Sequence, residues 1–240
     1  MTRRPRIRRA LRMPRAPHPP RVGTAIILCG GRSSRAGVDK QTLPCGGTTL
    51  PLAIAGKLSS LFPEIIFVTT TPERYAGSGF AAVRDVVADA GPLAGILTGL
   101  LRASGEYAYV TAGDMPWPNI DYIRWMARLL EADSPAAIAT RQGAHHLEPF
   151  NSIFSVRCVA TMRAALDRGE RGVCRYLRGC GQAVMVPEEM ARAFSPDWSM
   201  FASINTRADV QRFLRGARHG ESAARASLGR ELAAQEPAAR

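Results

Sequence analysis

The sequence predicts an α/β fold of three layers, in which a mostly parallel β-sheet lies between helices on both of its faces. Short apolar runs of strand character alternate with segments of helical periodicity along most of the 240 residues, an order typical of βαβ units. The runs "TAIILC" and "EIIFV" are apolar almost throughout, as in strands buried on both faces. Because the crossovers are right-handed, helices cover both sides of the sheet, which gives a Rossmann-like α/β/α architecture.

Each expected element follows from its local pattern. Apolar runs bounded by turn residues predict strands at 24–29, 64–70, 81–87, 107–112, 136–140, 151–156 and, shorter, 182–186. Helical periodicity predicts helices at 50–61, 93–103, 120–131, 157–167 and 207–218. Thr206 is suited to cap the N-terminus of the last helix. Ligands of open α/β sheets bind at the carboxyl ends of strands, so chemically active residues are expected just after them.

Charge and composition divide the chain into a tail, one domain and a second tail. Residues 1–21 hold eight of the twelve net positive charges, five prolines and no acid, so we expect a disordered Arg/Pro-rich segment there. A polyanion-attracting tail or a misplaced start codon would each explain it, since the fold needs nothing before Val22. The expected domain spans 22–215, and residues 216–240 are expected to form a flexible C-terminal tail.

The composition also excludes several classes of protein. Beyond residue 21 the net charge is modest, so the core is not expected to bind nucleic acid. No run of about 18 apolar residues is present, so a membrane span is not expected. The five cysteines form no C-x-x-C pair, and their odd number argues against a disulfide framework. Reduced thiols predict a cytoplasmic protein.

The segment "GGRSSRAGVDK" at 30–40 directly follows the first expected strand. Gly30 and Gly31 lack side chains, so their backbone N–H groups can approach an anion closely. Arg35 and Lys40 can neutralise a polyphosphate. The spacing fits neither G-x-x-x-x-G-K-[ST] nor G-x-G-x-x-G, which leaves an anion-binding loop or a plain surface loop as the two interpretations.

Further polar residues follow later strands. Asp114 comes after Gly113 at the end of the fourth expected strand, where it could bind Mg²⁺ together with phosphate oxygens or cap the next helix. Asn205 is either a turn residue or a neutral metal ligand. Asp85 and Asp89 precede "GPLAGILTGL" and could bond ribose hydroxyls or order a metal-bound water. Gly95 and Gly99 of that segment lie four positions apart, on one face of the expected helix. They either allow the helix to pack closely on the sheet or leave backbone N–H groups free near a ligand.

Together these clusters resemble the signature of the MobA-type molybdenum cofactor guanylyltransferases, a family with the nucleotide-diphospho-sugar transferase-like α/β fold. That family reads Leu-Ala-Gly-Gly, then Ser-x-Arg-Met-Gly and x-Asp-Lys, where this chain reads "LCGGRSSRAGVDK". "GPLAGI", "GDMP", "GERGV" and "INT" follow in the family's order, and the resemblance covers about residues 22–214. The glycine loop is common to many nucleotidyltransferases, whereas "GDMP" with "INT" narrows the resemblance to this branch.

The resemblance implies a role for each matched position. Lys40 would hold the phosphates of the nucleotide, and Asp114 would bind both the nucleotide and Mg²⁺. Asp85 matches the nucleotide-binding Asp of the family by its distance before Gly91, and Asp89 is the alternative match. Asn205 would be a second metal contact. Contacts to the guanine nucleotide would come from Leu28, Cys29, Gly30 and Gly31.

The implied reaction is Mg²⁺-dependent transfer of GMP from GTP to the terminal phosphate of molybdopterin, which releases pyrophosphate and forms the guanine dinucleotide cofactor. A phosphate nucleophile is largely ionised near pH 7, so no strong general base is needed. Catalysis would rest on positioning and on charge neutralisation by Arg35, Lys40 and the metal at Asp114. Other cofactor-biosynthesis proteins and acceptor apoenzymes are further implied partners. Candidates for the pterin pocket are His145, His146 and Arg171.

Three departures from the family pattern bear on specificity. Cys29 replaces Ala, a small-for-small change, and Ala36 replaces a Met that packs beneath the loop. The segment "VTTTP" at 68–72 lacks an Asn that some members place after the second strand, which leaves the choice of base open. The alternatives are a cytidylyltransferase on the same cofactor, another small-molecule nucleotidyltransferase, and a non-catalytic nucleotide- or polyanion-binding protein.

Overall fold

A computed structural model of the chain describes residues 22–30, 38–85, 90–133, 135–143 and 146–219. Its centre is a seven-stranded sheet in the order β5-β4-β1-β6-β8-β7-β9, and β2 and β3 form a separate two-stranded ribbon. The strands are β1 (Val22–Cys29), β2 (Pro44–Cys45), β3 (Thr48–Thr49), β4 (Glu64–Thr69), β5 (Ala81–Arg84), β6 (Tyr107–Ala112), β7 (Ala137–Gln142), β8 (His146–Ser155) and β9 (Ala183–Pro187). The helices are α1 (Leu50–Leu58), α2 (Pro92–Arg102), α3 (Ile120–Asp133), α4 (Cys158–Asp167), α5 (Val173–Gly179), α6 (Glu188–Arg192) and α7 (Arg207–His219).

The large sheet is mostly parallel, as the sequence predicts. β1 runs parallel to both β4 and β6, β4 to β5, and β7 to β9. Among the described strands of this sheet, only β8 is reversed, and it pairs antiparallel with β6 and β7. The carboxyl ends of β1, β4 and β6 therefore lie side by side at one edge of the sheet.

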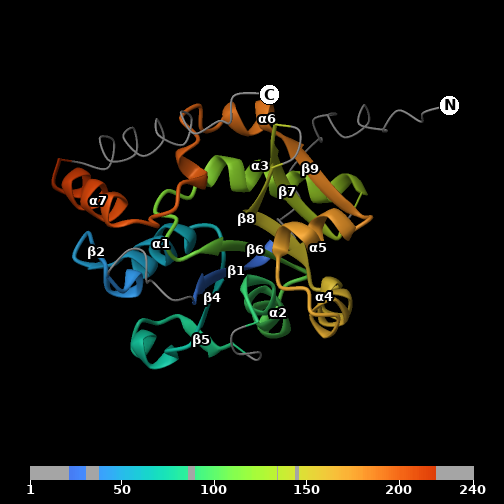
Figure 1. The fold of residues 1–240 in the computed structure, drawn as a ribbon, viewed down its shortest axis with the longest axis horizontal. Helices are drawn as coiled ribbons and strands as arrows, with labels where there is room; N and C mark the ends of the chain where they lie inside the picture. The colour runs from blue at the N-terminus through green and yellow to red at the C-terminus, as the bar shows by residue number, and fades with distance from the viewer. Residues whose placement is uncertain (1–21, 31–37, 86–89, 134, 144–145, 220–240) are drawn as a thin grey trace.

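Helices cover both faces of the sheet (Figure 1). Successive residues of β1 point to opposite faces: Ile27 packs in a buried cluster with α1, α3 and α7, and Ile26 packs in a second cluster with α2, α4 and α5. Both side chains are completely buried. This alternation explains why "TAIILC" is apolar throughout, and the three-layer α/β/α prediction is confirmed.

Strand β8 begins at His146, well before the expected start at residue 151. Pro149 has no N–H to give to a ladder, so a strand that contains it is hard to recognise in a sequence. The structure places it within an irregular stretch, because the pairing of β7 with β8 shifts between Ile138 and Thr140. Asn151 takes a left-handed conformation there, with φ of 57°, and this irregularity brings Phe150 to the edge of the sheet where the cleft opens.

Two short helices, α5 and α6, are absent from the prediction because they are too short to show a helical period. The third strand ends at Arg84, and residues 86–87 of its predicted span lie outside the described residues. Helix α7 runs to His219, past residue 215, and the domain limits remain a prediction. Within the ranges described above, no helix is both long and apolar enough to cross a bilayer.

Helix α2 packs closely on β1 through its two glycines. A Cβ at Gly99 would lie 2.6 Å from Cγ2 of Ile26, and one at Gly95 would lie 3.2 Å from Cδ2 of Leu28. The interpretation of these glycines as a close-packing surface is therefore confirmed. Gly95 also brings the first turn of α2 next to the cleft.

We expect Gly99→Ala to lower the free energy of unfolding by about 1–3 kcal/mol, because the added methyl overpacks the contact with Ile26. Gly56→Ala is the matched control: Gly56 is exposed in α1 with open space around its Cβ position, so alanine should stabilise by up to about 1 kcal/mol. Urea denaturation of both variants measures the difference. Equal stabilities for the two would contradict the packing described for α2.

Candidate active site

A cleft of about 500 Å³ opens at the carboxyl ends of β1, β4 and β6. Every described residue to which the sequence analysis assigns a contact with the nucleotide, its phosphates or the metal lines it: Leu28, Cys29, Gly30, Lys40, Asp85, Asp114 and Asn205. The other residues with such a role lie outside the described residues: Gly31, Arg35 and Asp89. The fold thus gathers residues from five segments of the sequence, whereas their individual roles remain predictions.

Lys40 lies between two side-chain oxygens in this cleft. Its Nζ donates to Oδ2 of Asp114 at 2.7 Å and to Oδ1 of Asn205 at 3.0 Å, although these residues are 74 and 165 positions away in the chain. The side chains of Lys40 and Asp114 are only 18% and 21% exposed, so solvent screens this ion pair less than it screens a surface pair. One cation and two oxygen atoms that accept its hydrogen bonds therefore meet at one point.

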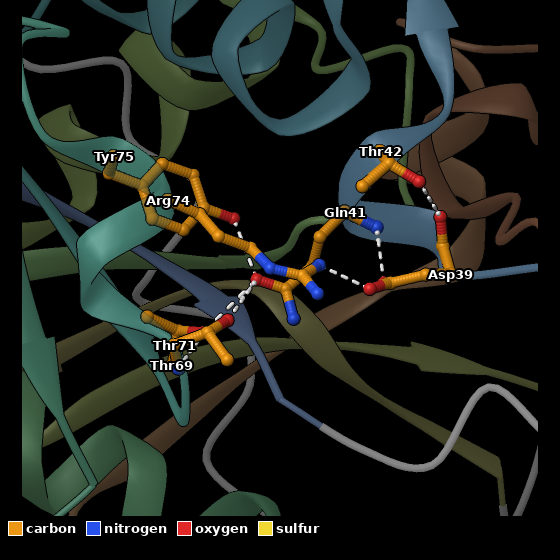
Figure 2. A network of polar contacts seen from close by, with 7 residues as sticks. All are labelled: Asp39, Gln41, Thr42, Thr69, Thr71, Arg74 and Tyr75. Atoms are coloured by element: carbon orange, nitrogen blue, oxygen red, sulfur yellow. Dashed lines mark hydrogen bonds and ion pairs between the residues drawn. The ribbon is translucent and has the colours of Figure 1, made fainter.

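The one-turn helix η2 (Lys40–Thr42) sets the direction of Lys40. Asp39 caps this helix, because its Oδ1 accepts a hydrogen bond from the N–H of Gln41 at 3.0 Å and its carbonyl accepts one from the Thr42 hydroxyl at 2.9 Å. The second carboxylate oxygen of Asp39 pairs with Arg74 (Figure 2). Asp39 thereby ties the turn that carries Lys40 to the segment after β4, a role that its place in the motif does not reveal.

Asp114 is held where β6 ends. The N–H of Gly113 donates to the carbonyl of Leu28 at 2.9 Å, and the carbonyl of Asp114 accepts from the N–H of Ile204 at 2.9 Å. A Cβ at position 113 would lie 2.6 Å from Sγ of Cys29, so only glycine fits there without a shift. The glycine before Asp114 is thus explained by the close approach of two strand ends.

Asn205 is positioned by the start of α7. The Thr206 hydroxyl accepts from the N–H of Asp209 at 3.1 Å, and Oδ2 of Asp209 accepts from the N–H groups of Asn205 and Thr206 at 2.9 and 2.6 Å. This reciprocal pattern is a capping box, and it confirms Thr206 as the N-cap. Burial alone would raise the pKa of Asp209, but the hydrogen bonds from the two backbone N–H groups outweigh it and hold the pKa below its ordinary value.

Asp85 follows β5 and faces helix α2. Its Oδ1 accepts a hydrogen bond from the Thr98 hydroxyl at 2.9 Å, and Oδ2 lies 3.8 Å from the position that a Cβ of Gly95 would take. Thr98 therefore orients the carboxylate at the rim of the cleft. Sequence reasoning missed Thr98, since a threonine on a buried helix face gives no signal of a polar partner on a distant strand.

Cys29 lies on the floor of the cleft and is 5% exposed. Burial raises the pKa of its thiol to about 12, the hydrogen bond with Tyr75 acts in the opposite direction, and the Asp114 carboxylate raises it further. The thiol is therefore neutral at physiological pH and acts as a small packing group. None of the five cysteines, all of which lie in the described ranges, is in a disulfide.

The two described candidates for a pterin pocket, Arg171 and His146, do not line this cleft. Arg171 bonds the carbonyl of Leu166 through Nη1 at 2.9 Å, and its backbone oxygen lies 3.1 Å from where a Cβ of Gly91 would be. His146 is 65% exposed and pairs with Glu148 at 3.6 Å. His145 lies outside the described residues. Arg171 thus supports the loop that borders the cleft, and His146 does not line it.

The model of the MobA-like NTP transferase domain matches residues 25–184. The chain is 42% identical over 195 residues to the molybdenum cofactor guanylyltransferase of Syntrophotalea carbinolica, across 81% of this chain and 92% of that protein. It is 38% identical over 196 residues to the probable molybdenum cofactor guanylyltransferase of Peptoclostridium acidaminophilum, across 80% and 88%.

Two solved structures share the fold. The molybdopterin-guanine dinucleotide biosynthesis protein A of Archaeoglobus fulgidus has a TM-score of 0.71 at 22% identity and covers 82% of this chain and 100% of its own. A nucleotidyl transferase from Methanothermobacter thermautotroptrophicus has a TM-score of 0.60 at 22% identity, with coverage of 82% and 97%. At these identities the likeness shows the fold alone, and it confirms the predicted fold class.

We expect Asp209→Asn to destabilise the protein by about 1 kcal/mol at neutral pH, because the neutral amide loses the charge that strengthens the two backbone hydrogen bonds and the ion pair with Arg212. The pKa of Asp209 is held below its ordinary 3.8, so the stabilisation is full above that value and is lost as the pH falls through the lowered pKa. Urea denaturation across pH should show the gap to the wild type closing in acid. Asp121→Asn, at an acid that is 79% exposed in α3, is the control, and a pH-independent gap would refute the assignment.

We also expect the Cys29 thiol of the native protein to resist iodoacetamide at mildly alkaline pH, because it is buried and protonated. Mass spectrometry of peptides after timed alkylation measures this, with the half-buried Cys45 as the internal comparison. After unfolding in urea both thiols should react alike. Alkylation of Cys29 in the native protein at the rate of Cys45 would show that the cleft floor is more open than described.

Proposed function

Because the chain belongs to the MobA-type molybdenum cofactor guanylyltransferase family of nucleotidyltransferases, we propose that it transfers GMP from GTP to the terminal phosphate of molybdopterin and releases pyrophosphate. The chain is a nucleotidyltransferase of molybdenum cofactor biosynthesis. The nucleotide GTP, the metal Mg²⁺ and the acceptor molybdopterin are the proposed part. The observation that best supports this proposal is the contact of Lys40 with Asp114 and Asn205.

The residues at this contact fit a site for a metal–triphosphate. The Lys40 ammonium already rests between a carboxylate oxygen and an amide oxygen, at 2.7 and 3.0 Å, so the position accepts a cation. Mg²⁺ takes one or two protein oxygens and completes its shell with phosphate oxygens and water. Asp114 and Asn205 would hold it, and when bound it would neutralise charge on the triphosphate.

In the proposed reaction, an oxygen of the acceptor's terminal phosphate forms a bond to the α-phosphorus of GTP as the bond to the β-phosphate oxygen breaks. The pyrophosphate leaves with the electron pair of that bond. The acceptor phosphate is already an anion near pH 7, so the step needs no general base, and the neutral Cys29 thiol beside Asp114 is not required to act as one. Lys40 would neutralise the α-phosphate and hold it in line, so that catalysis rests on positioning and electrostatics.

The other end of the cleft offers groups suited to a nucleoside. Asp85 lines the cleft with one carboxylate oxygen bonded to Thr98, and its carboxylate could accept from ribose hydroxyls. Leu28 packs beside Gly95 and supplies an apolar surface for a base. These contacts support a nucleotide lying along the carboxyl ends of β1, β4 and β5.

A cytidylyltransferase of the same fold is the second candidate, because the segment 68–72 carries no amide. Pyrophosphate release with each of the four nucleoside triphosphates and a molybdopterin acceptor separates the two. Family membership favours either enzyme over a non-catalytic nucleotide- or polyanion-binding protein. A deletion of residues 1–21 that still turns over GTP would remove that third alternative.

We predict that Asp114→Asn lowers kcat/KM for Mg²⁺-dependent pyrophosphate release from GTP by on the order of 100-fold or more. The substitution removes the negative charge but keeps the shape, so the fold should persist. Asp121→Asn is the matched control, since Asp121 lies on the exposed surface of α3 and should leave the rate unchanged. Near-wild-type turnover by a folded Asp114→Asn variant would contradict the proposal that Asp114 binds the metal.

A further inference from the structure

The amide of Gln41 is fixed in the cleft by three hydroxyl groups that converge on its oxygen. Oε1 accepts from Thr69 at 3.0 Å, from Tyr75 at 3.1 Å and from Thr71 at 3.3 Å. The Thr69 hydroxyl also accepts the N–H of Thr71 at 3.2 Å, so its own proton is available for Gln41. With Oε1 facing them, all three hydroxyls can donate their protons to the carbonyl end of the amide.

The amide nitrogen of Gln41 therefore points the other way. In Figure 2 the hydrogen bonds meet at the oxygen, and the nitrogen carries none. Within the described part of the chain, Nε2 has no hydrogen-bond partner, and Gln41 lines the cleft together with Thr69 and Thr70. The cleft thus holds a hydrogen-bond donor whose direction is set by its surroundings.

Lys40 and Gln41 are neighbours in η2, yet their side chains reach opposite sides of the end of β1. Lys40 reaches Asp114 at the end of β6, and Gln41 reaches Thr69 at the end of β4. Since β1 lies between β4 and β6, the two groups are separated by about two strand spacings, roughly 10 Å. A nucleotide with phosphates at Lys40 can bring its base near Gln41.

We propose that Gln41 selects the base, by donating a hydrogen bond from Nε2 to a ring carbonyl oxygen such as O6 of guanine. Cytosine and adenine present an amino group at the corresponding edge, so two donors would face each other and the contact would be lost. The amide that the segment 68–72 lacks is thus brought to the end of β4 from η2. This inference rests on the proposed function, because it uses the placement of the phosphates at Lys40.

Tyr75 acts here as a positioning residue. It is 3% exposed, stacks on Phe67 with ring centroids 4.1 Å apart, and so offers its hydroxyl to Gln41 from a fixed place. Removal of that hydroxyl should loosen the amide without unpacking the ring. Tyr75→Phe therefore tests whether the orientation of the amide, and not only its presence, determines selectivity.

The test compares kcat/KM for GTP and CTP, together with the Kd of each nucleotide by calorimetry without acceptor. Gln41→Glu keeps the shape but leaves only acceptors, so the GTP:CTP ratio should fall about 10-fold or more. Gln41→Met, which lacks both groups and guards against misfolding of the charged variant, should also lower the ratio. Tyr75→Phe should lower it less. Gln182→Glu, the same change at an exposed position before β9, should leave it unchanged.

A wild type that prefers GTP, with ratios unchanged in Gln41→Glu and Gln41→Met, would overturn the role of Gln41 and leave the proposed function intact. A wild type that neither binds nor turns over GTP in preference to CTP would overturn both. A fall in the ratio in both Gln41 variants, seen in Kd as well as in kcat/KM, would support the assignment.

Discussion

The Lys40 ammonium draws Asp114 and Asn205 to one point in the cleft, and the other features of the site serve to keep it there. Asp39 caps the turn that carries Lys40, and Asp209 holds the backbone before α7. A partly buried charge without a partner is costly, so the three segments stabilise one another. Phosphate oxygens can replace the carboxylate beside Lys40, which would release Asp114 and Asn205 for a cation brought with the nucleotide.

The end of β1 divides this cleft into two regions with different chemistry. On the β6 side lie the Lys40 ammonium and the side-chain oxygens of Asp114 and Asn205. These groups suit the binding of phosphates and the transfer reaction. On the β4 side, three hydroxyls orient the neutral amide of Gln41, and Thr98 orients the carboxylate of Asp85. A single turn, η2, contributes one side chain to each region. The Asp39–Arg74 pair, which fastens that turn to the segment after β4, therefore bears on both catalysis and selectivity.

The sequence predicted the layers and the polar residues at the strand ends, because both depend on local patterns. Asp114 and Asn205 stand directly after apolar runs, and parallel strands bring such positions to one edge. Gln41 and Thr98 had no such signal, since each acts through a partner on another element. Strand β8 was predicted too short because Pro149 interrupts its pattern, and only the irregular pairing with β7 accommodates it. Local sequence patterns thus predict the strands, the helices and the residues at the strand ends. Contacts between residues far apart in the sequence determine how the side chains of the site are oriented.

The most direct measurement is a crystal structure of the protein with Mg²⁺ and a GTP analogue whose α–β bridge cannot be cleaved. The account predicts the triphosphate at Lys40, with metal density beside Asp114 and Asn205, and the guanine at the end of β4 within hydrogen-bond distance of Gln41. A triphosphate bound away from Lys40, or a nucleotide lying in the opposite direction along the cleft, would contradict it.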